Sequence, residues 1–352
     1  MKKKALIAMS GGVDSSVAAF LMKQAGYECV GATMRLWSGS SDSDVNDAES
    51  VAKKLDMPFY AFDLQDEFEK CVIGNFISEY ENGRTPNPCI QCNKYLKFGK
   101  LIEKAYELGC DTIATGHYAE VIFDETTGEY MLKKGADLSK DQSYVLYPLT
   151  QNELAKTVFP LGKYTKAQIR EIAEENGFVN SRKKESQDIC FVPDGDYASF
   201  IESRMSEPCR KGKFVLQNGE VLGEHGGIIR YTIGQRKGLG ISYSVPLFVC
   251  DKNPKTNEVV LTTGYALFTR EVFAKDANII SPKGLEKGQR VFARTRYNMK
   301  EQPAVAELIS DDTIRLVFDE PQRAAAPGQS LVLYDGDFVI GGGIITKQEN
   351  IK

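Results

Sequence analysis

The sequence of 352 residues predicts an α/β fold: a parallel sheet covered by helices, then a small basic domain, then a C-terminal β-barrel. Up to residue 205, short apolar segments with strand character alternate with segments of helical spacing, which is typical of a parallel sheet with crossover helices. A glycine-rich turn joins the first strand to the first helix. After residue 205 the chain changes to short alternating strands separated by Gly, Asn and Asp turns, which indicates a barrel.

The N-terminal elements follow from apolar spacing and from residues that end helices. The segment 13–25 has apolar residues at helical spacing and stops at Gly26. Two prolines interrupt the loop 83–88, and a polar loop is expected at 38–44. We expect strands at 4–9, 28–34, 58–63 and 111–115, and helices at 13–25, 47–55, 66–80, 94–108 and 165–176.

The C-terminal half is expected to be all β. Asn218-Gly219 lies between two short apolar runs, which predicts a hairpin. Five further strands are expected at 291–296, 304–309, 313–318, 330–334 and 338–345. We therefore expect three domains, at 1–205, 206–277 and 278–352.

Composition excludes several classes of protein. With 42% hydrophobic and 26% charged residues, the chain is expected to fold into globular domains. The apolar run at the start covers only residues 5–9, too short for a signal peptide, and no run approaches the ~18 residues of a membrane helix. We expect a cytoplasmic protein with no membrane partner, whose eight cysteines are reduced. Only two histidines are present, so we expect neither a His-rich metal site nor a His-based triad, and we predict no metal-ligand residues.

Charge is unevenly distributed along the chain, although the net charge is only −4. Residues 42–69 hold nine acids and two lysines, and residues 206–248 hold six basic and three acidic residues. The basic segment is suited to phosphate contact, or is simply a solvated face. We expect five basic side chains of the two C-terminal domains to face phosphates: Arg230, Arg236, Lys237, Arg294 and Arg296.

The strongest motif is the turn Ser10-Gly11-Gly12-Val13-Asp14-Ser15-Ser16, directly after the first strand. Glycines let backbone N–H groups point at one anion, and the start of the following helix adds a favourable potential. The Gly-Lys-Ser/Thr ending of a Walker A loop is missing. The motif predicts a phosphate site; the alternative is a tight turn that caps a helix. It resembles the SGGxDS loop of the PP-loop ATP-pyrophosphatases, which cleave ATP between the α and β phosphates and transfer AMP to an oxygen.

Cysteines supply the second and third motifs. Cys89 and Cys92 form a CxxC motif. Such a motif supplies half of the ligands of a zinc site, forms a redox pair, or contains a single activated thiol. For Cys92, the positive dipole end of the helix that starts at Lys94, together with the charge of Lys94, would favour the thiolate. Cys190 follows Ser186-Gln187-Asp188-Ile189, and Arg182, Lys183 and Lys184 precede that motif and would favour a thiolate too. Taken alone, Cys190 also fits a buried small apolar residue.

Together these stretches resemble the tRNA-specific 2-thiouridylases of the MnmA type (MnmA/TrmU family). The resemblance spans residues 8–297 in order and extends to the PGQ at 327–329. It rests on the stretches AMSGGVDSSVAA, RTPNPC, QCNKYLKF, ATGHYA, KDQSYVLY, SQDICF, HGGIIRYTIGQRKGLG and ARTRY. It implies a sulfurtransferase that uses ATP to adenylate the C2 oxygen of the wobble uridine and then replaces that oxygen with sulfur.

The resemblance implies a role for individual residues. Cys92 matches the nucleophile and Cys190 the persulfide carrier, and the two would form a transient disulfide bond. The ATP site would comprise Ala8, Met9, Ser10, Gly11, Gly12, Val13, Asp14, Ser15, Met34 and Gly116. The target base would contact Asn87, Pro88 and Cys89. Other tRNA contacts would be His117, Lys140, Asp141, Gln142, Arg296, Tyr297 and Gln329.

Cofactor and partners follow from the same resemblance. ATP would bind with Mg²⁺, on which Asp14 would act, and the partners would be tRNA and a persulfide donor, either a sulfur-relay protein or a cysteine desulfurase. Because Cys92 and Cys190 are 98 residues apart and a disulfide needs Cα atoms within about 7 Å, we expect the loop that holds Cys190 to move.

The sequence departs from the family at Cys89, where many members have Asp. A thiol is a poorer base than a carboxylate at neutral pH. It is also a third thiol able to compete in disulfide exchange with Cys92. Two other functions stay open: another AMP-forming ligase, such as an amide-forming synthetase, and a catalytically silent tRNA-binding module.

Overall fold

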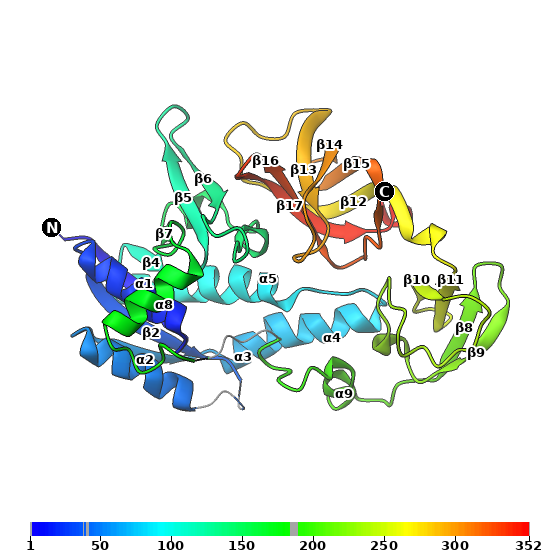
Figure 1. The fold of residues 1–352 in the computed structure, drawn as a ribbon, viewed down its shortest axis with the longest axis horizontal. Helices are drawn as coiled ribbons and strands as arrows, with labels where there is room; N and C mark the ends of the chain where they lie inside the picture. Colours follow the sequence, from blue (N-terminus) through cyan, green and yellow to red (C-terminus); the bar gives the residue numbers. More distant parts are fainter. Residues whose placement is uncertain (1, 38, 40–41, 184–188, 352) are drawn as a thin grey trace.

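A parallel sheet forms the centre of the N-terminal part of the computed structural model, which describes residues 2–37, 39, 42–183 and 189–351. The strand order is β3-β2-β1-β4-β7, and every pairing is parallel. The strands are β1 (Lys4–Ala8), β2 (Glu28–Arg35), β3 (Phe59–Asp63), β4 (Thr112–Ala114) and β7 (Thr157–Val158). The predicted α/β class is confirmed (Figure 1).

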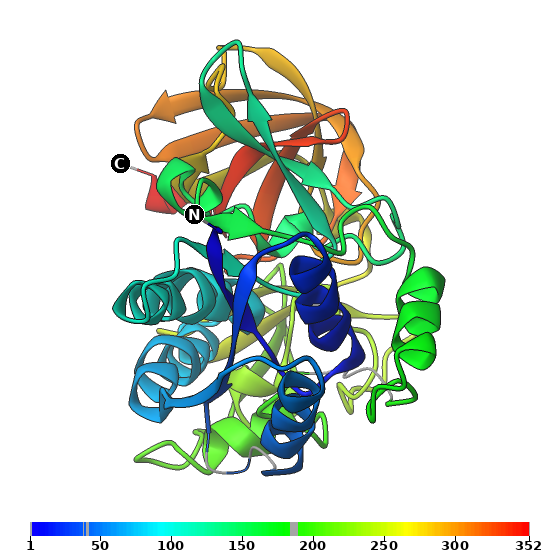
Figure 2. The ribbon, with the colours of Figure 1, turned by 90° about the vertical axis from the view of Figure 1, so that its left-hand side faces the viewer.

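Helices cover both faces of this sheet (Figure 2). Ala5 and Ile7 of β1 belong to an apolar cluster with α1, α2 and α8, whereas Leu6 belongs to a cluster with α6. This alternation is the period of two expected of a strand buried on both faces. The helices are α1 (Val13–Gln24), α2 (Asp42–Lys54), α6 (Leu101–Glu107) and α8 (Lys166–Glu175).

Two long helices that cross below the barrel contain π-helical segments (Figure 1). The first runs through α3 (Gln65–Phe68), the π segment η1 (Glu69–Ile73) and α4 (Gly74–Glu81). The second runs through α5 (Pro88–Cys92), the π segment η2 (Asn93–Lys100) and α6. These π segments were not predicted from the sequence. The spacing of apolar residues does not distinguish an α-helix, with 3.6 residues per turn, from a π-helix, with slightly more.

Two helices begin earlier than predicted. The helix expected at 94–108 begins at Pro88, because Asn87 caps it through its side chain and Pro88 occupies the first turn. The helix expected at 47–55 begins at Asp42, and the acids Asp42 and Asp44 of its first turn suit a helix N-terminus. Residues 42–44 of the predicted polar loop at 38–44 thus belong to this helix, and residues 38, 40 and 41 lie outside the described residues.

A hairpin that the sequence did not indicate leaves the N-terminal sheet and joins the barrel. Its strands are β5 (Ala119–Asp124) and β6 (Glu129–Lys134), and β6 pairs with β17 through Lys133 and Phe338. The short elements that follow are η3 (Ser143–Val145) and α7 (Gln151–Leu154). The hairpin links two parts of the chain that are far apart in sequence.

The middle part is a small sheet with strand order β10-β11-β8-β9. The predicted hairpin is confirmed: Gly219 has a φ of 88°, and Asn218 Oδ1 accepts a hydrogen bond from Glu220 N at 3.0 Å. The elements are α9 (Tyr197–Glu202), β8 (Gly212–Leu216), β9 (Val221–His225), η4 (Ile228–Arg230), β10 (Phe248–Asn253), β11 (Glu258–Thr262) and η5 (Tyr265–Leu267).

The C-terminal part is the predicted barrel, closed by pairing of β12 with β17. Its elements are β12 (Phe268–Ile279), β13 (Gln289–Arg294), β14 (Gln302–Ser310), β15 (Thr313–Arg323), β16 (Ser330–Asp335), β17 (Phe338–Thr346) and η6 (Gln348–Asn350). Strand β12 was not predicted, and it crosses the expected boundary at 277/278. The three domain ranges themselves stay a prediction.

Candidate active site

The glycine-rich turn between β1 and α1 has the backbone geometry of an anion site. Gly11 has a φ of 72°, and a Cβ there would collide with the Asp44 carbonyl. Gly12 is the N-cap of α1, and no side chain caps that helix end. The hydroxyls of Ser15 and Ser16 both donate to Gly12 O, at 3.0 and 3.1 Å. The free N–H groups at the start of α1 are therefore available to bind an external anion, such as the phosphates of ATP.

Two residues that follow α8 form polar contacts that stabilise this turn and the start of α2 beside it. Buried Asn180 donates through Nδ2 to Gly11 O and to Ser16 Oγ, both at 2.9 Å. Lys183 Nζ lies 2.6 Å from an oxygen of Asp44 and 2.7 Å from one of Asp47. The prediction that Lys183 favours a thiolate at Cys190 is therefore wrong: this lysine supports the turn.

Asp14 is already engaged within the protein. Lys166 Nζ lies 2.7 and 2.8 Å from its two carboxylate oxygens, and Tyr118 donates its hydroxyl hydrogen to Oδ1 at 2.7 Å. A Mg²⁺ ion at Asp14 would share these oxygens with Lys166. Within the described residues, no group of three or more His, Cys, Asp or Glu side chains is placed to hold a metal ion.

The remaining predicted ATP residues lie at the same edge of the sheet. Met9 follows β1 and donates its N–H to Ala32 O at 2.7 Å, and Met34 is the penultimate residue of the neighbouring β2. Gly116 lies two residues after β4 and packs against the start of α1: a Cβ there would lie 2.9 Å from the Asp14 carbonyl carbon and from Ser15 N. The structure thus gathers these positions where the carboxyl ends of parallel strands form a crevice.

Cys89 and Cys92 lie on the first turns of the helix that begins at Pro88. Asn87 Oδ1 accepts a hydrogen bond from Cys89 N at 3.1 Å, which fixes the helix start. Cys89 is exposed and Cys92 half-buried. The barrel approaches this turn: Gln329 Nε2 donates to Thr85 O at 2.8 Å.

Cys190 lies beside the same helix, although it is 98 residues away in sequence. Ile189 and Cys92 pack against one apolar cluster, which also contains Phe191. Phe191 packs edge-on against Phe68 and Phe76, with ring centroids 5.6 and 5.3 Å apart. Cys190 itself is exposed, so it is not the buried small apolar residue of the alternative interpretation. Lys184 and Ser186-Gln187-Asp188 lie outside the described residues.

The thiols are less acidic than predicted. Burial raises the pKa of Cys92 to about 12; Lys97 lowers it, and the neighbouring Cys190 and Cys89 raise it. Cys89 and Cys190 are exposed at the surface, but the protein atoms packed around their thiols partly desolvate them and so raise both pKa values, and Lys97 opposes both shifts. The predicted source of positive charge is wrong: Lys97 acts on these thiols, whereas Lys94 lies over the Tyr95 ring. Arg182, which was also predicted to favour a thiolate at Cys190, lies 3.9 Å from the Glu174 carboxylate.

His117 is a buried residue that contacts Lys97. Its ring packs between Phe98 and Phe159, and burial, with Lys97 adding, lowers its pKa well below the usual value, so the ring is neutral. Nδ1 lies 2.6 Å from Thr115 Oγ1, and Nε2 lies 3.4 Å from Lys97 Nζ. Its contact with tRNA stays a prediction. The His117 side chain is only 6% exposed.

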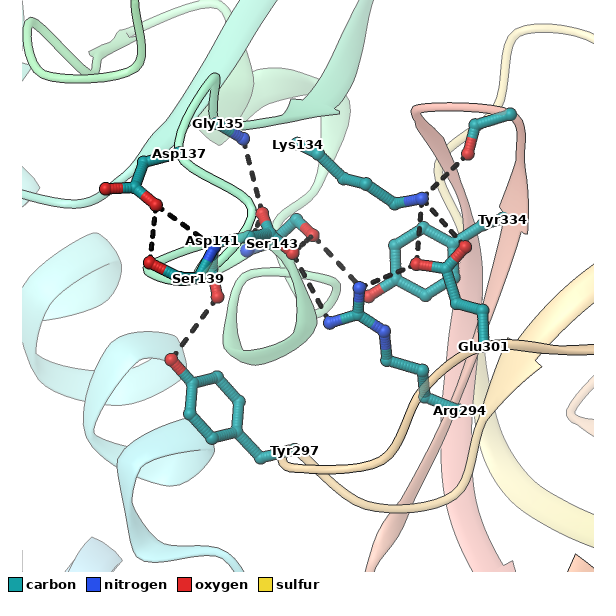
Figure 3. A network of polar contacts seen from close by, with 11 residues as sticks. Lys134, Gly135, Asp137, Ser139, Asp141, Ser143, Arg294, Tyr297, Glu301 and Tyr334 are labelled. Carbon is teal, nitrogen blue, oxygen red and sulfur yellow. Dashed lines mark hydrogen bonds and ion pairs between the residues drawn. The ribbon is translucent and has the colours of Figure 1, made fainter. Parts of the chain in front are cut away.

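Other predicted tRNA residues join the N-terminal part to the barrel (Figure 3). Buried Asp141 accepts hydrogen bonds from Gly135 N and from both Ser143 N and Oγ, and Arg294 Nη1 lies 3.4 Å from its Oδ2. Arg294 also donates to Glu301 at 2.6 Å, and Glu301 pairs with Lys134. The prediction that Arg294 faces phosphate is therefore wrong.

Gln142, Tyr297 and Arg296 also make contacts inside the protein. Gln142 Oε1 accepts from Tyr118 N at 3.0 Å, and Tyr297 donates its hydroxyl hydrogen to Asp141 O at 3.3 Å. Arg296 Nη2 donates to Ile233 O and Ala324 O, both at 2.9 Å. Burial, with Asp141 and Cys89 adding, raises the pKa of Tyr297, which places this tyrosine at the thiol site.

The two remaining basic positions differ from the others. Arg230 pairs with Glu202, and Arg296 donates to the two carbonyls named above. Of the other predicted phosphate contacts, Arg236 and Lys237 have no acidic partner among the residues that the structure describes. Arg236 lines a cavity of about 460 Å³ formed mainly by residues 238–247. Lys140, in the loop before Asp141, donates its backbone N–H to Asp137 O at 2.9 Å.

A sequence-based search for site residues missed Lys97, Tyr118, Lys166 and Asn180. Tyr118 and Lys97 lie inside the quoted stretches ATGHYA and QCNKYLKF, and that position was the available signal. Nothing in the sequence indicates that Lys166 reaches Asp14, 152 residues away.

The parallel sheet, the uncapped glycine turn at its edge and the thiols beside it define the class of PP-loop ATP-pyrophosphatases that carry an appended barrel. Three family models match the chain in order: the tRNA methyl transferase HUP domain at residues 3–194, the tRNA methyl transferase PRC-barrel domain at 198–263 and the aminomethyltransferase beta-barrel domain at 269–345. The chain belongs to the family of tRNA-specific 2-thiouridylases of the MnmA type.

Known relatives match over nearly the whole chain. The "tRNA-specific 2-thiouridylase MnmA" of Clostridioides difficile is 50% identical and covers 99% of both chains. That of Carboxydothermus hydrogenoformans is 48% identical, over 99% of this chain and 98% of the other. A solved 4-thiouridine synthetase–RNA complex with bound ATP is 18% identical over 57% of this chain and 50% of that one, at a TM-score of 0.38. No helix among the described residues is long and apolar enough to span a membrane.

Proposed function

We propose that this chain is an ATP-dependent tRNA 2-thiouridylase, a sulfurtransferase that replaces the C2 oxygen of the wobble uridine with sulfur. The observation that carries the proposal is the continuity of the two sites. Gly116 lies against the glycine-rich turn, and the next residue, His117, contacts Lys97 on the helix that bears Cys89 and Cys92. Membership of the family supports the same reaction.

The first step consumes ATP. The C2 oxygen attacks the α-phosphorus and pyrophosphate leaves, because an oxygen bonded as in a urea is a poor leaving group until it carries AMP. The backbone of residues 10–15 would hold the phosphates. Mg²⁺ is usually bound by one or two carboxylates together with substrate phosphates, so Asp14 alone fits it as a protein ligand. Bound there, Mg²⁺ would neutralise phosphate charge.

The second step transfers sulfur. The terminal sulfur of a persulfide on Cys190 attacks C2, and the C2–O bond breaks as AMP leaves. The Cys92 thiolate then attacks Cys190 Sγ, so the sulfur stays on C2 and a Cys92–Cys190 disulfide forms. An external dithiol must reduce this disulfide before the next turnover. All eight cysteines are free in the structure.

Cys89 would act in this scheme as a protonated group. Because burial raises the pKa of its thiol, Cys89 is a proton donor and not a base at neutral pH. Its place at the helix start next to Tyr297 suits a contact with the target base. The family's Asp is thus replaced by a group that can still hydrogen-bond but carries no charge.

Partners and location follow from the same proposal. The substrate would be tRNA, whose wobble base must leave the anticodon stack to reach the thiols. The exposure of Cys190 suits delivery of sulfur by a sulfur-relay protein or a cysteine desulfurase. Free cysteines throughout the chain suit the reducing cytoplasm.

Mass spectrometry of tRNA nucleosides, after incubation with ATP and a persulfide donor, tests the proposal. We expect 2-thiouridine from the parent chain, none from Cys190→Ser or Cys92→Ser, and a rate lowered by ~10²-fold or less for Cys89→Ser. Cys92→Ser should still accept sulfur on Cys190. Pyrophosphate release without thiouridine would favour another AMP-forming ligase, and tRNA binding without pyrophosphate release would favour a silent binding module.

A further inference from the structure

The π segment η2 changes which side chains share a face with Cys92. In an α-helix, residues five apart point about 140° away from each other. A π-helix closes its hydrogen bonds between residues five apart, so it brings such residues towards one face. Cys92 is the residue just before η2, and Lys97 lies five positions later within it. The π segment therefore turns Lys97 towards the thiols.

Lys97 is held by a neutral group. Its Nζ lies 3.4 Å from Nε2 of His117, whose Nδ1 contacts Thr115 Oγ1 at 2.6 Å. With Lys97 donating to Nε2, the ring proton lies on Nδ1 and donates to Thr115. Among the described residues Lys97 has no carboxylate partner. A carboxylate would neutralise the ammonium, whereas the neutral imidazole holds it in place and leaves its charge available.

Lys97 is also the cation that acts on the whole thiol cluster. The groups that face Cys92 are Cys89 on its own helix and Cys190 on the segment packed against it, and Lys97 is the source of positive charge opposing the raised pKa of each thiol. With the Lys97 charge already included, the pKa of Cys92 is about 12, so its thiol is ionised to only about one part in 10⁵ at pH 7. Loss of the Lys97 charge would raise this pKa further and lower the thiolate fraction.

We propose that Lys97, held by His117, is the positioning residue that stabilises the Cys92 thiolate when it attacks the persulfide sulfur. The inference rests on the proposed function, because it assigns Cys92 the role of nucleophile. It also gives His117 a role that needs no contact with tRNA: the ring orients Lys97.

The test measures alkylation of Cys92 by iodoacetamide in the full chain, without ATP or tRNA, at values between about pH 7.5 and 9.5, all well below the Cys92 pKa, so that the rate follows the thiolate fraction. A Cys89→Ser background isolates Cys92 within its tryptic peptide. The variants are Lys97→Met, Lys97→Arg and the matched control Lys94→Met, an exposed lysine of the same helix without an acidic partner among the described residues.

An opposite charge next to a thiol shifts its pKa by about 1–3 units, so loss of the cation should raise it by about that much, and the higher intrinsic nucleophilicity of the more basic thiolate offsets about half of the effect. We expect Lys97→Met to slow alkylation about 3- to 30-fold at each pH, Lys97→Arg to restore most of the rate, and Lys94→Met to leave it unchanged. His117→Ala should give an intermediate loss.

Equal alkylation rates for Lys97→Met and Lys94→Met would overturn the proposal. A Lys97→Arg variant that is alkylated as slowly as Lys97→Met would also overturn it. ATP binding at the parent level shows that each variant is folded. Because the alkylation assay needs no thiouridine formation, failure of the proposed function and failure of the Lys97 inference are separate results.

Discussion

Replacing Arg294 by methionine should destabilise the protein far more than the same change at Arg290, four residues earlier on β13. Both arginines pair with carboxylates at comparable distances, 2.6 Å from Arg294 to Glu301 and 2.7 Å from Arg290 to Asp319. Their surroundings differ: the Arg294 side chain is 14% exposed, and the Arg290 side chain is 61% exposed. The two variants thus compare a buried ion pair with a solvated one.

The magnitude follows from what each arginine leaves behind. Removing one partner of a buried pair costs about 3–5 kcal/mol. After Arg294→Met, Glu301 keeps Lys134 at 2.7 Å and Asp141 keeps its three hydrogen bonds from Gly135 and Ser143. We therefore expect the low end, about 3 kcal/mol. Arg290→Met should cost about 0–1 kcal/mol, as exposed pairs do.

Paired urea titrations of the two variants measure this difference, and the salt dependence of tRNA binding checks the accompanying claim. Arg294→Met should leave the slope of log K against log salt unchanged, because the guanidinium faces carboxylates and not phosphates. Equal losses of stability in the two variants would refute the reasoning from burial. A slope lowered by roughly 1 with stability intact would show that Arg294 faces RNA after all.

Three further results are expected. Arg236→Ala, which removes a cation without an acidic partner among the described residues, should weaken tRNA binding and lower the salt slope by roughly 1; an unchanged slope would make Arg236 a solvated charge. Asp14→Ala should abolish AMP and pyrophosphate formation while tRNA binding stays largely intact, and pyrophosphate release at the parent rate would contradict the ATP site. Burial lowers the pKa of Lys252 to about 7, so the unfolded chain binds one more proton above that pH and stability should rise with pH, by roughly 1.6 kcal/mol from pH 7 to 8.5. Lys252→Met should lose this rise in urea titrations, and an unchanged pH dependence would mean that Lys252 is charged when folded.

Local sequence signals located the elements of the N-terminal sheet but not the contacts between distant parts. The glycine turn after β1 was predictable because glycine, serine and helix-start preferences all act within a few residues. Asn87 and Pro88 carried an N-cap signal of the same kind, but the two prolines nearby favoured a loop. The hairpin β5–β6 was missed because its stabilising neighbour, β17, lies some 200 residues later.

At the candidate site, too, local motifs were predictable and long-range contacts were not. Local sequence left several interpretations open for each cysteine motif, and only the family resemblance joined Cys92 and Cys190 as a pair. The acidity of these thiols was not predictable, because it depends on burial and on Lys97, whose orientation is set by a π segment. Likewise Arg294 looked like a phosphate contact until Asp141 and Glu301 were found beside it, and no local pattern indicates such pairing.

The bond from Gln329 to Thr85 sets an order of events during synthesis. The loop that leads into Cys89 is held by a residue 244 positions later, near the end of the chain. At about 5–20 residues per second, translation supplies that residue about 12–50 s after the loop itself has been made. The N-terminal sheet can form earlier, but its thiol-bearing helix start is fixed only once the barrel has emerged and docked. In a nascent chain the glycine-rich turn would therefore be complete before the start of the thiol-bearing helix is fixed.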